Sequence, residues 1–254
     1  MRKCIVCGGD LEKTAGGDYQ CVFCLRRYPD EEERTSARGA VSTGTNKGVD
    51  IFEQNRNGVL EITCRFSTGV SAGSGFLIDG NGHAITNTHV VTDKARPCGD
   101  ISVKIAGETV RASVLVLGDD RGGQGNGVDL ALIKLARVPF GAQPVRFGNF
   151  SEVRNGEQVF VIGNSLGDGM CITGGIVSDR KRVLQGKTLL MTDCAVNGGN
   201  SGGPIFNGKG EVIGAIVSSR VHQDGSATEG MNYAIPSYIV QEFLSGKHTA
   251  VKVS

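Results

Sequence analysis

The chain has 254 residues, a formal net charge of +1 and 39 glycines, roughly twice the usual share of that residue. The balanced charge gives no support for nucleic acid or an anionic membrane as the main partner, and no apolar run reaches the roughly 18 residues that span a bilayer. The length accommodates one domain of about 200 residues or two smaller ones, and abundant glycine without tryptophan favours an all-β protein with many tight turns.

Half of the eight cysteines form two C-x-x-C pairs, Cys4 with Cys7 and Cys21 with Cys24. Each pair can place two thiolates on one tight turn, and two such turns make the tetrahedral sulfur site that zinc prefers. The alternative is a pair of disulfides in a small secreted domain, but no apolar signal segment precedes Cys4. Residues 1–28 therefore resemble a zinc ribbon that holds one structural zinc ion.

The predicted ribbon has few basic residues in excess of its acidic ones, so it lacks the dense cationic patch of a strong phosphate binder. A docking site for a protein partner, or simple stabilisation of the N-terminus, is favoured over recruitment to nucleic acid, which remains the weaker alternative. Residues 29–48 are acidic and then rich in Thr, Ser, Gly and Asn without a hydrophobic period, and they predict a flexible linker.

From residue 49 onward, short apolar runs alternate with turn signals, as is typical of a barrel or sandwich. A short helix around Ile51 leads into a strand, and Asn81-Gly82 separates two strands as a hairpin turn. Further strands are expected at 101–105, 110–117, 130–135, 159–162, 172–177, 189–192, 212–218 and 232–235, and a helix at 237–244. Roughly a dozen strands predict two small six-stranded antiparallel barrels in residues 49–246, followed by a C-terminal tail at 247–254.

One serine, Ser201, lies among four glycines in the segment Asn197-Gly-Gly-Asn-Ser-Gly-Gly-Pro204. A hydroxyl attacks a carbonyl only with a base to take its proton and backbone N–H donors to hold the oxyanion. Glycine tolerates backbone angles that a β-carbon forbids, so the amides of Gly199 and Ser201 can face one point. The alternative is an ordinary glycine-rich turn, and only a base with an orienting group would favour the nucleophile.

A base and a carboxylate occur at strand ends. His89 lies in Ile85-Thr-Asn-Thr-His-Val-Val91, and Asp129 opens Asp129-Leu-Ala-Leu-Ile-Lys134. Each alone would be explained as an ordinary polar residue or a cap. Together with Ser201, their order and contexts resemble the chymotrypsin-like (trypsin-fold) serine proteases.

Three further segments resemble the HtrA (Deg) branch of that family, and the resemblance covers residues from about 49 to 245. They are Thr192-Asp-Cys-Ala-Val-Asn-Gly-Gly-Asn-Ser-Gly-Gly-Pro204, Gly73-Ser-Gly-Phe76 and Gly230-Met-Asn-Tyr-Ala-Ile-Pro236. The resemblance implies Ser201 as nucleophile, His89 as general base, Asp129 as its orienting group, the amides of Gly199 and Ser201 as oxyanion hole, and no cofactor for catalysis.

The chain departs from the family pattern at two positions before the serine. Asn200 replaces the aspartate that pairs with a freshly cleaved N-terminus in digestive members, so activation by N-terminal cleavage is not expected. Ala195 would lie at the base of the specificity pocket and carries no charge, which disfavours cleavage after Lys or Arg. With Val217 and Ser218 along the pocket, we expect cleavage after small or medium apolar residues.

The remaining cysteines do not match the disulfide positions of secreted relatives, which together with the N-terminus predicts a cytoplasmic location. These cysteines are Cys64, Cys98, Cys171 and Cys194. Because the chain ends within about 20 residues of the last predicted strand, we expect no C-terminal PDZ domain.

The leading hypothesis is a zinc-ribbon-tethered serine endopeptidase that hydrolyses unfolded or specifically presented protein segments through an acyl-enzyme. Its partners would be protein or peptide substrates, without a membrane, and the sequence allows an oligomer. The alternative is a latent protease-fold module that binds or regulates a partner recruited through the ribbon.

Overall fold

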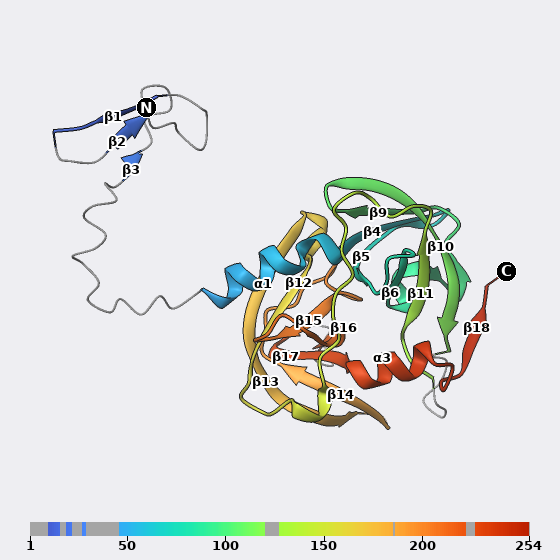
Figure 1. Cartoon of the computed structure of the whole chain (residues 1–254). Helices are drawn as coiled ribbons and strands as arrows, with labels where there is room; N and C mark the ends of the chain where they lie inside the picture. The colour runs from blue at the N-terminus through green and yellow to red at the C-terminus, as the bar shows by residue number, and fades with distance from the viewer. Residues whose placement is uncertain are drawn as a thin grey trace. The chain divides into compact units, whose positions relative to one another are not determined.

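The computed structural model describes residues 10–15, 19–21, 27–28, 46–119, 127–184, 186–221 and 227–253. The chain divides into two units, Met1–Thr45 and Asn46–Ser254 (Figure 1). The first unit contains a three-stranded antiparallel sheet of β1 (Leu11–Lys13), β2 (Tyr19–Cys21) and β3 (Arg27–Tyr28).

The predicted zinc ligands fall almost entirely outside the described residues. Cys4, Cys7 and Cys24 lie outside them, and only the backbone of Cys21, at the end of β2, is described. The predicted linker also lies outside them as far as residue 45. Its last residues belong instead to helix α1 (Lys47–Asn55), which leads through the short helix η2 (Arg56–Gly58) into the first long strand.

Six strands of the second unit form a ring, because β11 pairs with both β6 and β10. The strands are β4 (Val59–Phe66), β5 (Gly69–Leu77), β6 (His83–Thr86), β9 (Ile101–Ile105), β10 (Glu108–Gly118) and β11 (Ala131–Leu135). The short helix α2 (Thr88–Val91) and the two-residue strands β7 (Thr92–Asp93) and β8 (Arg96–Pro97) connect β6 to β9.

A seventh strand, β18 (Ala250–Lys252), joins this sheet, where the sequence predicted a C-terminal tail. It pairs antiparallel with the last residues of β10, with Val251 opposite Leu117. Three residues are too few for a strand pattern to be recognised, and their strand conformation depends on the part of the β10 edge that β9 does not cover. The first predicted barrel is therefore a six-strand ring with one added strand.

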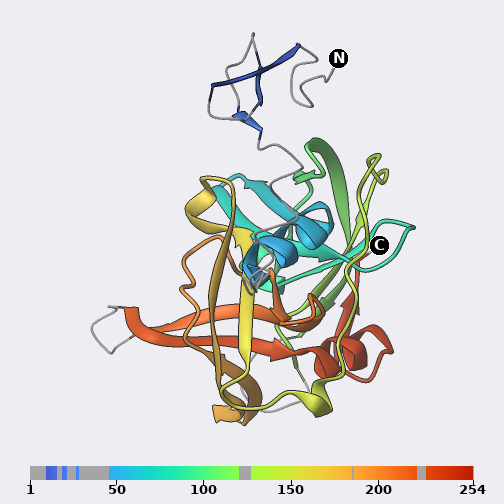
Figure 2. The ribbon, with the colours of Figure 1, turned by 60° about the vertical axis from the view of Figure 1, so that its left-hand side comes forward.

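The second predicted barrel is confirmed as a closed barrel of six strands. Its strands are β12 (Gln158–Asn164), β13 (Met170–Leu184), β14 (Lys187–Thr192), β15 (Pro204–Asn207), β16 (Val212–Val221) and β17 (Ala227–Pro236). The strands β16 and β17 run side by side as a long antiparallel pair (Figure 2). Two short helices, η3 (Phe150–Glu152) and η4 (Ser165–Gly167), flank β12, and α3 (Ser237–Leu244) follows β17 as predicted.

A shared hydrophobic cluster joins the two halves of the second unit. It combines Phe76 of β5 and Leu130, which directly precedes β11, with Phe206 and Ile235 from the second barrel, all of them buried. Phe76 is fully buried, which contributes about 1.5–3 kcal/mol, and its ring meets that of Phe147 edge to face at 6.1 Å between centroids. This core fixes the halves against each other, so side chains from both can form one site.

Within the part of the chain that the structure describes, no helix combines the length and the apolar composition that crossing a membrane requires.

Candidate active site

The register of one strand pair brings the predicted base and carboxylate together. Strand β6 ends at Thr86, which lies opposite Ala131, the first residue of β11. The residues that follow β6 and those that precede β11 therefore meet at the same edge of the sheet. His89 follows β6 on the short helix α2, and Asp129 stands two residues before β11.

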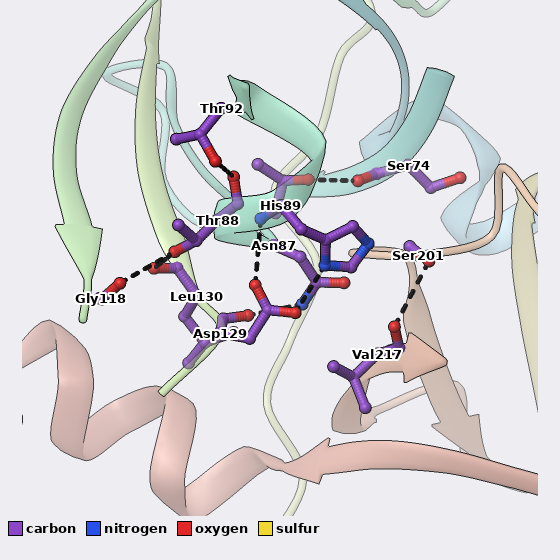
Figure 3. Close-up of polar contacts among 11 residues, drawn as sticks. Ser74, Asn87, Thr88, His89, Thr92, Gly118, Asp129, Leu130, Ser201 and Val217 are labelled. Carbon is purple, nitrogen blue, oxygen red and sulfur yellow. Dashed lines mark hydrogen bonds and ion pairs between the residues drawn. The ribbon is translucent and has the colours of Figure 1, made fainter. Parts of the chain in front are cut away.

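Asp129 holds His89 through both of its carboxylate oxygens. The imidazole Nδ1 lies 2.6 Å from Oδ2, and the backbone N–H of His89 donates to Oδ1 at 3.1 Å (Figure 3). The aspartate side chain is 11% exposed and that of the histidine 50%. A proton on Nδ1 leaves Nε2 as the basic nitrogen of the ring. Figure 3 shows the ring between the Asp129 carboxylate and Ser201.

Two side chains beside His89 bind the backbone around Asp129. The amide of Asn87 donates from Nδ2 to the carbonyl of Asp129 at 2.7 Å, and the Thr88 hydroxyl donates to the carbonyl of Leu130 at 2.8 Å (Figure 3). Sequence reasoning assigned no role to either residue, although both belong to the quoted segment around His89. Their polar side chains directly before the histidine were the only available signal.

Ser201 comes from the other half of the unit, three residues before β15. Its hydroxyl donates to the carbonyl of Val217 in β16 at 3.4 Å (Figure 3). Gly199, two residues earlier, has a φ of 93°, and a β-carbon there would lie 2.1 Å from the carbonyl oxygen of Asn164. Only glycine fits this position, as the sequence predicted for a loop that turns its amides.

The N–H groups of this loop differ in their partners. Those of Asn200, Gly202 and Gly203 donate to backbone carbonyls. Among the residues that the structure describes, the N–H groups of Gly199 and Ser201 donate to none. Two N–H groups without a partner beside a serine hydroxyl are the arrangement that an oxyanion requires.

The residues predicted for the specificity pocket lie on the strands and loop next to Ser201. Ala195 is exposed, and its carbonyl accepts a hydrogen bond from the Thr173 hydroxyl at 2.9 Å. Val217 is partly buried in β16, and the backbone of Ser218 pairs with Tyr233 of β17. No acidic side chain stands at position 195.

A cavity of about 740 Å³ adjoins the His89–Asp129 pair. Its lining includes Thr92 and Pro97 of the segment after α2, Leu117 of β10 and the C-terminal residues Val251 to Val253. Strand β18 therefore borders the space next to His89, whereas a C-terminal tail was predicted for these residues.

Curated relatives with a substantial identity to this chain are much longer than it. A "Probable periplasmic serine endoprotease DegP-like" of Ectopseudomonas mendocina (strain ymp) is 37% identical over 169 residues, which cover 65% of this chain and 33% of the relative. A protein of the same name from Rickettsia prowazekii (strain Madrid E) is 33% identical over 240 residues, covering 89% and 44%. The chain thus spans about a third to a half of these relatives.

These names contradict the predicted cytoplasmic location, because the relatives are described as periplasmic. That prediction relied on four single cysteines and on the N-terminus. The four cysteines are free thiols in the structure, and Cys64, Cys98 and Cys194 are buried. Burial raises the pKa of the Cys194 thiol to about 11 and protects it from thiolate chemistry, so such cysteines do not identify a compartment.

Solved structures share the fold. An HtrA-type protease, AlgW, with a tripeptide superimposes with a TM-score of 0.65 at 23% identity, covering 79% of this chain and 64% of AlgW. The family model for the trypsin-like peptidase domain matches residues 73–214, a range that contains His89, Asp129 and Ser201. This match covers more than half of the chain, and the chain therefore belongs to the trypsin-like peptidase domain family.

Proposed function

We propose that this chain is a serine endopeptidase of the HtrA type, with Ser201 as nucleophile, His89 as general base and Asp129 as the group that orients the imidazole. The observation that carries the proposal is the position of the His89–Asp129 pair beside Ser201, whose own N–H and that of Gly199 have no partner among the described residues. These groups match the requirements of acyl transfer.

In the proposed reaction, Ser201 Oγ attacks the substrate carbonyl while its proton passes to His89 Nε2. The carbonyl oxygen becomes an oxyanion that accepts hydrogen bonds from the N–H groups of Gly199 and Ser201. The imidazolium then protonates the leaving amine, the C–N bond breaks and an acyl-enzyme remains. Water repeats the attack with His89 as base, and the acid product leaves as Ser201 regains its proton.

The resting hydroxyl of Ser201 makes only a long hydrogen bond. Its 3.4 Å contact with the Val217 carbonyl is long for a hydrogen bond between a hydroxyl and an oxygen, so rotation toward the imidazole costs little. The unengaged N–H groups also support hydrolysis over the alternative of a latent binding module, in which such donors would be turned away or occupied.

We expect cleavage after small or medium apolar residues. Ala195 and Val217 offer no carboxylate to a cationic substrate side chain, and a buried cation without a partner is costly. A peptide series that varies only the residue before the scissile bond should show kcat/KM values at least about tenfold higher for Ala or Val than for Lys or Arg.

The same series run with the Ser201→Ala variant provides the background for this measurement. Efficient cleavage after Lys or Arg would contradict the proposed specificity and leave the proposed mechanism intact. No cleavage of any peptide, or of an unfolded protein such as casein, by the folded wild-type chain would refute the proposed function.

We infer that residues 1–28 bind one zinc ion through Cys4, Cys7, Cys21 and Cys24, because two C-x-x-C pairs can supply four thiolates. Metal analysis of the purified chain should find about one zinc per molecule, and Cys21→Ser should lower this content strongly. Cys171→Ser, which changes a single cysteine of the second unit, is the matched control and should keep the zinc. A metal-free chain with two N-terminal disulfides would contradict this inference.

A further inference from the structure

Ser74, in β5, lies under the loop that carries Ser201, and its side chain is fully buried. Its hydroxyl donates to the carbonyl of Gly199 at 2.7 Å, and its backbone N–H donates to the carbonyl of Ser201 at 2.8 Å. We propose that Ser74 is a positioning residue that holds the oxyanion-binding N–H groups of Gly199 and Ser201 in place. This inference rests on the proposed hydrolysis at Ser201.

The carbonyls of Gly198 and Gly199, before and after the Gly199 N–H, each accept one hydrogen bond. The carbonyl of Gly199 accepts from Ser74, and that of Gly198 accepts from the backbone N–H of Leu166 at 2.6 Å. Because a peptide group is planar and trans, the N–H of Gly199 points away from the Gly198 carbonyl, and so away from Leu166. The Leu166 bond opposes rotation of the peptide that carries the Gly199 N–H, and the Ser74 bond fixes the next peptide, so the backbone of Gly199 is anchored on both sides.

Leu166 has an unfavourable backbone conformation. Its φ is 58° and its ψ is 7°, a left-handed conformation that is unfavourable for leucine. Its side chain is mostly exposed, so packing of that side chain does not explain the conformation. A tight turn explains it, because Leu166 and Gly167 both have positive φ between Ser165 and Asp168, and the Asp168 N–H donates to the Ser165 carbonyl at 3.1 Å.

The Ser74 hydroxyl also connects the loop to the second barrel. It accepts a hydrogen bond from the N–H of Asn164, the last residue of β12, at 2.8 Å. The Asn164 carbonyl in turn lies against Gly199, where a β-carbon would approach it to 2.1 Å. One buried oxygen therefore acts as donor to the loop and as acceptor from the strand that borders it, so neither group remains without a partner.

Little space surrounds this hydroxyl. A β-carbon on Gly163 would lie 2.8 Å from Ser74 Oγ and 2.8 Å from Asn200 Oδ1. A larger side chain at position 74 would meet the same neighbours, whereas alanine would remove the bonds to Gly199 and Asn164 without adding atoms. Ser74→Ala therefore tests the contribution of the hydroxyl alone.

The test compares Ser74→Ala with Ser71→Ala, a serine on the same strand, in the full chain. Loss of an oxyanion donor typically costs about 100- to 1,000-fold in kcat, and a donor that is displaced rather than removed should cost less. We expect Ser74→Ala to lower kcat about 10- to 100-fold with KM changed less than about threefold. Inhibition by a peptide aldehyde, whose adduct places an oxygen at the same N–H groups, should weaken by a similar factor.

A merely structural serine would behave differently. If folded Ser74→Ala kept the wild-type kcat and aldehyde affinity and lost only thermal stability, the inference would be overturned while the proposed function stood. A folded wild-type chain without any hydrolysis would instead refute the proposed function. Ser71→Ala should match the wild type in kcat and in aldehyde affinity.

Ser74→Cys covers the case in which Ser74→Ala does not fold. The thiol is larger than the hydroxyl and donates only weakly, so kcat should fall below that of the wild type. Wild-type kcat and aldehyde affinity in Ser74→Cys would contradict the inference, because a weak donor could not hold the Gly199 carbonyl as the hydroxyl does.

Discussion

Replacing Ser201 with Ala should lower kcat for peptide hydrolysis by about a millionfold, which is the typical cost of removing the nucleophile of a serine protease triad. Without Oγ, no acyl-enzyme can form, and the remaining N–H donors of Gly199 and Ser201 support only slow attack by water. A fluorophosphonate probe should label the wild-type chain on Ser201 and leave Ser201→Ala unlabelled, as read by mass spectrometry of the modified peptide.

Ser151→Ala, which changes an exposed serine on η3, should keep both labelling and hydrolysis. Hydrolysis that survived in Ser201→Ala would show that another group is the nucleophile. A folded wild-type chain that was neither labelled nor active would favour the latent binding module, because the loop around Ser201 would then not assemble in solution.

Replacing Asp129 with Asn should lower kcat by about 10⁴-fold, as expected when the orienting carboxylate of a triad becomes an amide. The asparagine amide could donate to His89 Nδ1, which would move the imidazole proton to Nε2 and remove the basic nitrogen that faces Ser201. KM should change little, because Asp129 is nearly buried behind the ring and would not touch the substrate. Steady-state kinetics on one peptide measures both values.

The chain offers a matched control in a second carboxylate–imidazole pair. Asp79 Oδ2 lies 2.6 Å from His83 Nδ1, the same separation as in the proposed triad. Burial alone would raise the pKa of Asp79, but hydrogen bonds from His83 outweigh it and lower this pKa. Asp79→Asn should leave kcat within about threefold of the wild type. An equal loss of activity in both variants would indicate general destabilisation instead of a specific role for Asp129.

Local sequence patterns were sufficient to predict most strands of the second unit. The expected strand at 101–105 coincides with β9, the helix at 237–244 coincides with α3, and the hairpin around Asn81-Gly82 joins β5 to β6. Each of these predictions depends on alternating apolar and polar residues, a turn dipeptide or a helical repeat within a few residues. The three residues of the proposed triad could be predicted for the same reason, since each stands in a short recognisable segment.

The supporting contacts could not be found in this way because they join distant parts of the chain. Ser74 and Gly199 are 125 positions apart, and the Leu166 contact uses only a backbone N–H, which no side-chain pattern encodes. Strand β18 depends on an available edge of β10 and not on its own three residues. The compartment was predicted wrongly because cysteine content was taken as a sign of redox environment, whereas burial already accounts for the free thiols.

The C-terminal strand also has a consequence for the segment that leads to Asp129. Thr249, directly before β18, accepts a hydrogen bond from the Asp119 N–H at 3.1 Å and bridges to Gly127, so it fastens both ends of the segment that leads to Asp129. Val253 continues the contact by donating to the carbonyl of Leu115. Displacement of β18 would therefore remove the contacts that hold Asp119 and Gly127, the described residues on either side of the segment before Asp129.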